Sequence, residues 1–322
     1  MLAGALLGRG EARMHNPLMS PEPLLADGPA NPQREQNQRA AVLMVLSTAT
    51  IVCNDTIMKL VTETVPLYQA VVMRGIFILP LMMLYARRQG GLKLRLAPRD
   101  FAAVLLRSVF EVSSTILYLY ALRRMALADL SAIFQSLPLL VTLAAAVVFR
   151  EKLGRRRLAA IFVGFLGMLI ILRPGSSAFD IWALAVLASV ILIVGRDLTS
   201  RVVSPRVSST TIAFYAAGSV TLFGLAMLPT ESWQPMTAGE VGLMALAAGF
   251  IAVSYVAAIA TVRIGEISFV APFRYTALVW AIIMGAVVFG KWPDVWTQTG
   301  AVLIVGAGLY SIWREARIAR ES

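Results

Sequence analysis

The chain has 322 residues, of which 58% are hydrophobic and only 15% are charged, and its formal net charge is +11. With a mean hydropathy of +0.74, it is too apolar and too poor in charge to be a water-soluble domain. The apolar runs are continuous and about twenty residues long, which suits transmembrane helices and argues against a β-barrel, whose strands alternate over about ten residues. The sequence therefore predicts an all-α integral membrane protein.

The expected elements begin after a polar tail. Residues 1–38 are rich in Pro, Asn, Gln and Ala, and we expect them to form a disordered cytoplasmic tail. Turn signals then separate ten apolar spans. Their approximate ranges are 40–60, 66–86, 101–122, 127–149, 157–173, 179–199, 209–228, 239–262, 267–289 and 297–313. Residues 314–322 are expected to form a second cytoplasmic tail.

The spans fall into two copies of one unit. The run Ala-Val-Val-Phe at 146–149 recurs at 286–289, and the same shift of 140 residues aligns the copies, with small insertions, over about 120 residues. We assign the first repeat to residues 40–174 and the second to residues 179–313. Because five spans is an odd number, the second copy enters the bilayer from the opposite side, which predicts an inverted repeat around a central cavity.

Charge predicts the orientation. The basic residues cluster between the apolar spans, which is typical of membrane topology and argues against nucleic-acid binding. If the N-terminus is cytoplasmic, most of them lie inside, above all in segments 87–99 and 150–157, whereas segment 230–240 on the outer side carries acid without base. We therefore expect both termini in the cytoplasm and the protein in a bacterial-type inner membrane. The number of copies, one or two, stays open.

The sequence contains no signal for a cofactor. The single cysteine, Cys53, and the single histidine, His15, provide no metal-ligand spacing. No G-x-x-x-x-G-K-[ST] motif for ATP phosphates is present, so any energy for transport has to come from a gradient.

Motifs in both copies resemble those of a known family. The first copy has small residues followed by Pro138-Leu139 and Phe149-x-Glu151-Lys152-Leu153, and the second reads APFRY at 271–275 and FGKWPD at 289–294. This pattern resembles the drug/metabolite transporter superfamily, in particular its ten-helix members with two EamA repeats, which include carriers of amino acids, riboflavin and other metabolites. The resemblance covers about residues 40–315 and implies helices 1–4 and 6–9 around a cavity, with helices 5 and 10 more peripheral. One departure is that Lys291 and Trp292 stand where the second copy would have an acid.

Charges inside the spans are the main functional signal. A charge inside lipid costs about 2.5–3.5 kcal/mol on insertion scales, so each one needs a partner or a water-filled cavity. The charged residues within the spans or near their ends are Asp55, Arg74, Arg107, Glu111, Arg196, Asp197 and Arg274. Arg74 and Arg274 can grip a substrate carboxylate or phosphate with both guanidinium nitrogens. The alternative is that neighbouring acids or carbonyls satisfy them and they only lock helices together.

Glu111 lies one helical turn beyond Arg107, so an intrahelical ion pair is the simpler interpretation. The alternative hypothesis is a proton-coupling carboxyl, which takes up and releases a proton as the cavity changes sides.

Two acid–base pairs occupy equivalent positions in the two copies. Asp55 lies four residues before Lys59, and Asp197 lies four residues before Arg201. We expect them to act as gates that form and break alternately, or simply to face lipid headgroups at helix ends.

Uncharged polar and aromatic residues complete the candidate site. Asn54 and Gln135 can bond a substrate or bond across helices. Tyr118 and Tyr275 are the aromatic residues that we expect to stack against a planar ligand. The alternative is that they serve only in helix packing.

The function predicted is a secondary transporter of a small organic metabolite that works by alternating access, with proton coupling open. The substrate expected is planar or anionic: riboflavin, or an aromatic or carboxylate-bearing amino acid. The direction of transport stays open. The alternatives are a membrane-embedded enzyme acting on a lipid, which should show dense acid or His clusters, and a passive channel or scaffold.

Overall fold

A computed structural model describes residues 32–92, 95–148, 154–174, 180–204, 206–264 and 267–321. The described residues form helices and turns and no strand. The elements are α1 (Pro32–Val61), α2 (Leu67–Arg88), α3 (Pro98–Arg124), α4 (Leu127–Phe134), α5 (Leu137–Val148), α6 (Arg155–Leu172), α7 (Ile181–Val202), α8 (Ser209–Met227), η1 (Leu228–Thr230), α9 (Ala238–Ile264), α10 (Ile267–Val270), η2 (Ala271–Tyr275), α11 (Thr276–Phe289) and α12 (Val295–Glu321).

Nine helical stretches among these residues are long and apolar enough to cross a membrane. A shorter apolar helix, Leu158–Leu172, lies where the fifth span is predicted, so a tenth crossing stays a prediction. Two corrections concern the ends: α1 begins at Pro32, inside the predicted N-terminal tail, and α12 runs through most of the predicted C-terminal tail. Residues 1–31 of the N-terminal tail lie outside the described part.

The fourth and ninth predicted spans are each interrupted near a proline. Residues Gln135 and Ser136 separate α4 from α5, just before Pro138. The ninth span contains the 3-10 turn η2, which includes Pro272, between α10 and α11. Proline lacks a backbone N–H and clashes with the preceding turn, which explains why both helices break here.

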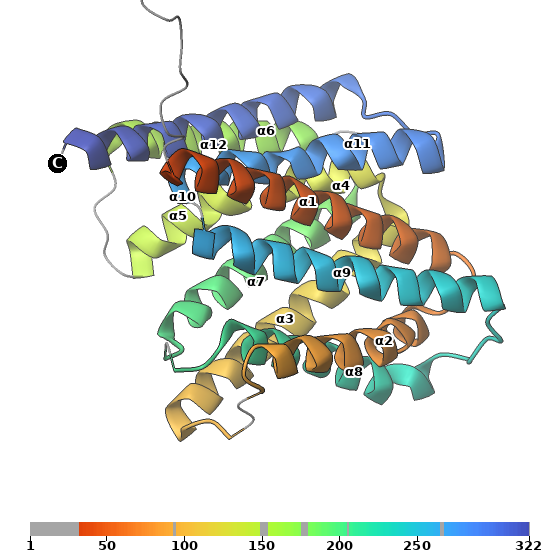
Figure 1. Ribbon diagram of the computed structural model, residues 1–322. Coiled ribbons are helices and arrows are strands. Elements are labelled where there is room, and N and C mark those ends of the chain that lie inside the picture. Colours follow the sequence, from red (N-terminus) through yellow and green to blue (C-terminus); the bar gives the residue numbers. More distant parts are fainter. Residues whose placement is uncertain are drawn as a thin grey trace, which may run out of the picture.

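The helices pack in pairs that join the first predicted repeat to the second. Helix α1 packs against α9 and α3 against α7, while α2 packs against α8 and α6 against α12 (Figure 1). Helix α4 contacts α11. Helix α1 also contacts α11, and the corresponding contact in the other half is that of α7 with α4 and α5. Each of these contacts maps onto another, or onto itself, when the two halves are exchanged.

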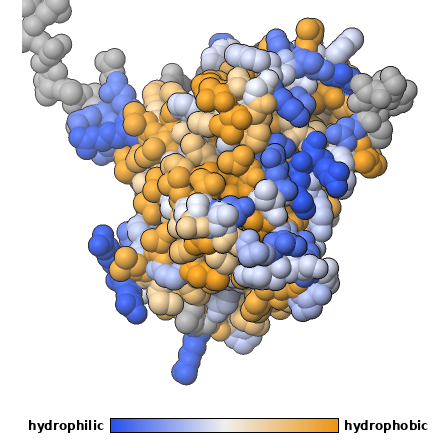
Figure 2. All heavy atoms as spheres, turned by 90° about the vertical axis from the view of Figure 1, so that its right-hand side faces the viewer, coloured by the Kyte–Doolittle hydropathy of each residue, from blue (hydrophilic) through white to orange (hydrophobic). Residues whose placement is uncertain are grey.

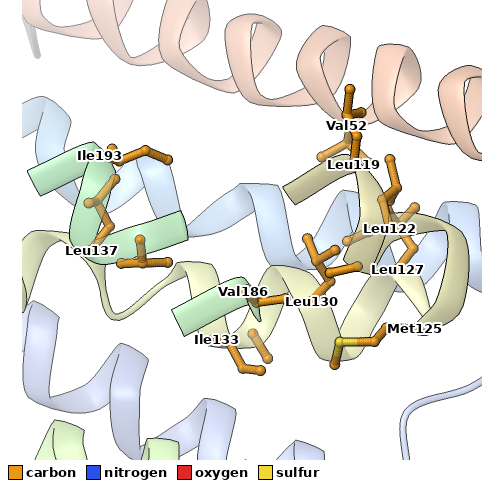
Figure 3. Close-up of a cluster of buried hydrophobic side chains, with 14 of the residues drawn as sticks. Val52, Leu119, Leu122, Met125, Leu127, Leu130, Ile133, Leu137, Val186 and Ile193 are labelled. Atoms are coloured by element: carbon orange, nitrogen blue, oxygen red, sulfur yellow. The ribbon is translucent and has the colours of Figure 1, made fainter. Parts of the chain in front are cut away.

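The hydrophobic core lies where α1, α3, α4 and α7 meet. Leu122, Leu130, Ile133 and Val186 are almost completely buried there, with Val52 of α1 beside them (Figure 3). The outer surface is also apolar: Val147, Val287 and Val302 are 72%, 77% and 71% exposed. Figure 2 shows hydrophobic residues spread over the surface, with hydrophilic ones gathered in patches. An apolar exterior suits contact with lipid acyl chains.

Helices α6 and α12 cross very closely. A Cβ atom on Gly167 would lie 2.7 Å from the carbonyl oxygen of Gly300, and a Cβ on Gly300 would meet the carbonyl oxygen of Gly167. Two glycines at the crossing let the backbones touch, which is how transmembrane helices gain packing without a hydrophobic driving force.

Candidate functional site

A cavity of about 240 Å³ lies inside the bundle, between helices of both halves. Its polar lining includes Asn54, Asp55, Arg74, Glu111, Gln135 and Arg196. Aromatic side chains form part of the wall: Tyr118, Phe134 and Tyr255. The structure therefore brings together six predicted site residues: Asn54, Asp55, Arg74, Glu111, Tyr118 and Gln135.

The amide of Asn54 stands between two opposite charges. Its Oδ1 accepts a hydrogen bond from Arg74 Nη1 at 3.3 Å, and its Nδ2 donates to Asp55 Oδ1 at 2.9 Å. The other oxygen of Asp55 accepts from the Tyr118 hydroxyl at 2.5 Å. None of the ion pairs found among the described residues joins Arg74 to Asp55. The amide thus keeps a buried cation and a carboxylate apart, so both signs of charge remain available to a ligand.

The location of these residues follows from their helices. Asn54 and Asp55 lie in α1, Arg74 lies in α2 and Tyr118 lies in α3. Asn54 and Arg74 are 1% and 9% exposed. Buried polar groups are costly unless they are hydrogen-bonded, so the cluster satisfies its members across three helices of the first half.

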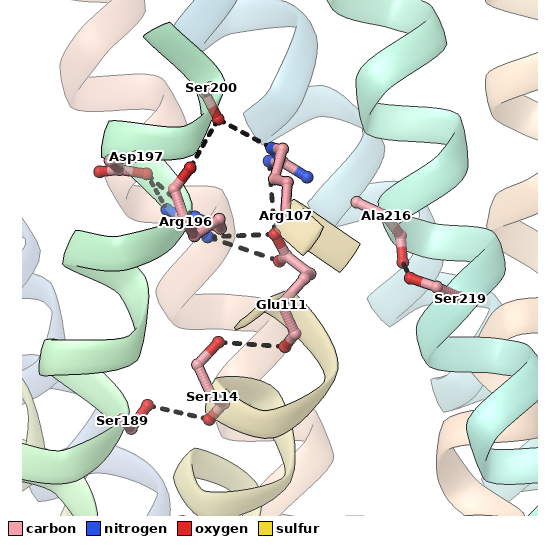
Figure 4. A network of polar contacts seen from close by, with 9 residues as sticks. All are labelled: Arg107, Glu111, Ser114, Ser189, Arg196, Asp197, Ser200, Ala216 and Ser219. Atoms are coloured by element: carbon pink, nitrogen blue, oxygen red, sulfur yellow. Dashed lines mark hydrogen bonds and ion pairs between the residues drawn. The ribbon is translucent and has the colours of Figure 1, made fainter. Parts of the chain in front are cut away.

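Glu111 is the centre of a second cluster, between α3 and α7 (Figure 4). Its Oε2 lies 3.3 Å from Arg107 Nη2, and both of its oxygens lie 3.4 Å from Arg196 Nη1. Arg196 also pairs with Asp197 at 2.9 Å, while Arg107 Nε donates to Ser200 at 2.9 Å. The intrahelical pair with Arg107 is therefore present, and a second arginine from the other half is added to it. Two guanidinium groups therefore contact the one carboxyl group of Glu111.

This second cluster continues along the α3–α7 contact. The Ser189 hydroxyl donates to the backbone oxygen of Ser114 at 2.9 Å, and the Ser114 hydroxyl donates to that of Glu111 at 3.0 Å (Figure 4). A row of polar bonds therefore joins α7 of one half to α3 of the other.

Arg274 and Tyr275 do not line the cavity. They lie in η2, where Arg274 is exposed and the Tyr275 ring is buried near Gly308 of α12. The backbone of Tyr275 contacts a residue of the cavity wall: its carbonyl oxygen accepts a hydrogen bond from Gln135 Nε2 at 3.2 Å. The sequence predicts one continuous helix over residues 267–289. A 3-10 helix has three residues per turn instead of 3.6, so the side chains after Pro272 point in other directions than they would in a continuous α-helix.

Of the two expected gate pairs, the described side chains test only Asp55–Lys59, which is not formed. Lys59 donates to the carbonyl oxygens of Leu122 and Met125, the latter at 2.8 Å, instead of pairing with Asp55. These carbonyls lie at the C-terminal end of α3, where a cation is stabilised by the helix dipole. Asp197 pairs with its neighbour Arg196. Arg201 lies in α7, and its side chain is outside the described part of the structure.

Other contacts tie the halves together at the end opposite the chain termini. Gln69 Nε2 donates to the Gln234 carbonyl at 2.7 Å, and the Gln234 N–H donates back to Gln69 Oε1 at 3.0 Å. The N–H of Tyr68 donates to Glu231 at 2.8 Å. Arg173, after α6, pairs with Asp294, before α12. No sequence pattern predicts these bonds, because they depend on which loops meet.

Arg107, Arg196 and Tyr255 are members of the site that were not selected as site residues from the sequence, where Arg107 was expected only as the ion-pair partner of Glu111. All three were visible as polar or aromatic residues inside predicted spans. Their convergence on one carboxylate or one cavity depends on α3 packing against α7 and α2 against α9, which no local pattern encodes.

A bundle of apolar helices around a polar, partly charged cavity is the architecture of a membrane carrier for small molecules. Comparison with known proteins supports this class. Residues 38–173 match the EamA-like transporter family. The chain is 28% identical to the pseudopaline exporter CntI of Pseudomonas aeruginosa (strain UCBPP-PA14), over 83% of this chain and 93% of that protein.

Two further relatives carry other names. A riboflavin transporter of Vibrio cholerae serotype O1 is 28% identical over 72% of this chain and 78% of its own length. An S-adenosylmethionine uptake transporter of Rickettsia prowazekii is 24% identical over 85% and 92%. A solved crystal structure with 18% sequence identity superposes with a TM-score of 0.62, covering 86% of this chain and 98% of that one, and it supports the fold alone. Together these matches support membership of the drug/metabolite transporter superfamily, which the motifs predict.

Proposed function

We propose that the protein is a secondary active transporter that moves a small organic metabolite across the inner membrane by alternating access. Its two units are residues 40–174 and 179–313, related as inverted repeats, with both termini in the cytoplasm. The exchange symmetry of the helix contacts supports the repeat, since α1–α9 corresponds to α3–α7. The observation that carries the proposal is the buried cavity between the halves, with Arg74, Asn54 and Asp55 on its wall.

The substrate best supported is an amino acid or a similar metabolite with a carboxylate, an ammonium group and a planar part. Arg74 suits the carboxylate, Asp55 suits the cation, and the amide of Asn54 keeps them from neutralising each other. Tyr118, together with Phe134 at a ring-centroid distance of 5.1 Å, provides an aromatic wall. Riboflavin would use the wall but leave one of the two charges unmatched.

Gln135 is retained as a substrate contact because it lines the cavity, at the break between α4 and α5. Arg274 and Tyr275 lie outside the cavity wall and receive no substrate contact in this conformation.

If transport is coupled to protons, Asp55 is better suited than Glu111 to carry the proton. Asp55 accepts hydrogen bonds from two neutral donors, the amide of Asn54 and the hydroxyl of Tyr118. Protonation of Glu111 would instead weaken its pairs with Arg107 and Arg196. We assign Glu111 the role of holding α3 against α7.

Gating is assigned to contacts between the halves instead of the pairs Asp55–Lys59 and Asp197–Arg201. The Gln69–Gln234 bonds close one end, and the Glu111–Arg196 pair joins the halves toward the other. In alternating access one set must break while the other holds.

Transport by purified protein in liposomes tests this function. A carrier of amino acids saturates and exchanges labelled for unlabelled substrate, whereas a channel does neither and an enzyme alters the compound. We expect Arg74→Ala to abolish exchange and Arg87→Ala, at the exposed end of α2, to leave it intact. Exchange that persists in Arg74→Ala at the wild-type rate would contradict the assignment of the cavity.

A pH step across the same liposomes tests coupling. We expect Asp55→Asn to lose any stimulation by the step, because the amide cannot take up a proton. Exchange at equal pH should continue only at higher substrate concentration, because the variant also lacks the charge that faces the substrate's cation. Stimulation that survives in Asp55→Asn would remove this residue from the coupling mechanism.

A further inference from the structure

A second cavity, outside the substrate site, lies in the groove between α6 and α12. It has a volume of about 370 Å³ and is lined by Ala159, Ala160 and Val163 of α6 and by Gly306, Ala307 and Tyr310 of α12, with Arg156. The two helices lie side by side along the top edge of the bundle in Figure 1. Nothing lies within 4 Å of the position that a Cβ atom on Gly306 would occupy, so this glycine leaves the groove open.

Positive charge is concentrated at one end of this groove. Arg155 and Arg156 are exposed in the first turn of α6, where the unpaired N–H groups of the helix add partial positive charge. On the neighbouring helix, Arg314 follows Tyr310 by four residues and so shares its face. The rest of the groove wall is apolar or small.

Aromatic residues mark the same level of the membrane. Tyr310 and Trp313 lie with their ring centroids 5.9 Å apart, and both are exposed. Tyrosine and tryptophan prefer the boundary between acyl chains and headgroups, so the arginines next to them lie at headgroup depth. Exposed Leu158 and Phe162 of α6 place the groove on the lipid-facing side of the bundle.

We propose that this groove binds one anionic phospholipid, with its phosphate at Arg155, Arg156 and Arg314 and an acyl chain along Ala160, Gly306 and Ala307. A bare apolar wall suits a hydrocarbon chain, and arginine forks suit phosphate oxygens. A second copy of the chain fits less well, because a two-fold interface on this face would bring the same arginines opposite one another.

Native mass spectrometry of the detergent-solubilised protein with phosphatidylglycerol or phosphatidylcholine tests the proposal. We expect one phosphatidylglycerol to stay bound per chain, with weaker retention of phosphatidylcholine. Arg156→Gln and Arg314→Gln should each weaken phosphatidylglycerol about fivefold, and together about twentyfold. Gly306→Leu, whose Cβ atom would meet nothing within 4 Å, places an apolar side chain in the groove and should reduce binding of both lipids.

Arg87→Gln with Arg88→Gln is the matched control, since it removes two exposed arginines from the end of α2, away from the groove. An equal loss of lipid in this control would overturn the proposal, as would equal retention of the two lipids by the wild type. A dimer that Gly306→Leu dissociates would assign the groove to a second copy instead. Thermal unfolding of each variant confirms that it is folded, and none of these results depends on which substrate the carrier moves.

Discussion

At the scale of single residues, the interior is organised by which acid each arginine reaches. Arg74 is separated from Asp55 by an amide, whereas Arg107 and Arg196 both contact Glu111. The first arrangement leaves charges available in the cavity, and the second uses them to hold two helices. Sequence position alone did not distinguish these roles, because all of these residues are charges inside apolar spans.

Glu111→Gln tests the structural role of the second cluster. The change leaves two largely buried guanidinium groups without their carboxylate, and breaking a buried ion pair from one side costs about 3–5 kcal/mol. We therefore expect a marked fall in the Tm of the detergent-solubilised protein. Asp197→Asn is the control, because the Asp197 side chain is 34% exposed and its removal leaves Arg196 paired with Glu111, so the effect should be small. A Tm for Glu111→Gln equal to that of the wild type would contradict this role.

At the scale of helices, the outermost pair is set by backbone contact and by one ion pair. The glycines at the α6–α12 crossing permit the contact, and the pairing of Arg173 with Asp294 ties the end of α6 to the start of α12. The small residues of these helices were recognisable in the sequence as packing residues, but their register against one another was not.

Gly300→Val tests the crossing. Its side chain would overlap the Gly167 carbonyl, and forcing extra methyl groups into a tight contact costs about 1–3 kcal/mol. We expect a lower Tm in detergent. Gly242→Val in α9, where a Cβ would meet nothing within 4 Å, should change the Tm much less. Equal effects in the two variants would mean that valine in a helix, not the crossing, is responsible.

Asp294 predicts an acid dependence of stability. Burial alone would raise the pKa of Asp294, but hydrogen bonds from Thr297 and the pairing with Arg173 outweigh it and hold that pKa below its ordinary value of 3.8. An acid with a depressed folded-state pKa stabilises the fold above its ordinary pKa, and this stabilisation is lost as the pH falls through the folded-state value.

We therefore expect Asp294→Asn to lower the Tm at neutral pH, and the difference from the wild type to shrink as the pH falls below about 4. Thermal unfolding of both proteins in detergent, between neutral pH and pH 3, measures this difference in Tm. A difference that stays constant over this range would mean that the ionised carboxylate is not what stabilises this end.

At the scale of the whole molecule, helices of the two halves alternate around the cavity, so most helix contacts are contacts between halves. Movement of one half against the other must therefore break contacts at one end of the bundle. The bonds between Gln69 and Gln234 are the clearest candidates at the end opposite the termini.

Cross-linking across that end tests whether it opens. In a Cys53→Ser background, Gln69→Cys with Gln234→Cys, joined by a short bifunctional methanethiosulfonate, should stop liposome transport, and reduction should restore it. The pair Thr237→Cys with Glu240→Cys lies within one half, where the two side chains are hydrogen-bonded at 2.9 Å, and joining it should leave transport intact. Full transport by the cross-linked Gln69–Gln234 pair would show that this end need not open.

Most of the architecture was accessible from the sequence. Apolar length, turn residues and the superfamily motifs predicted an all-helical membrane protein of the drug/metabolite transporter superfamily, because a membrane crossing imposes a local requirement of length and hydrophobicity on each helix. A polar group in an apolar helix is conspicuous, so Asn54, Arg74 and Gln135 could be selected as candidates. The structure places them on one cavity wall, and their part in transport stays a prediction.

The partners of those residues were decided only by the tertiary structure. Asp55 bonds Asn54 and Tyr118 instead of Lys59, Glu111 gains Arg196, and Arg274 lies away from the cavity. Hydrophobicity determines that a helix crosses the membrane but hardly determines its rotation or its neighbours. Those depend on shape, on close glycine contacts and on the 3-10 turn at Pro272, which exist only once the helices are packed.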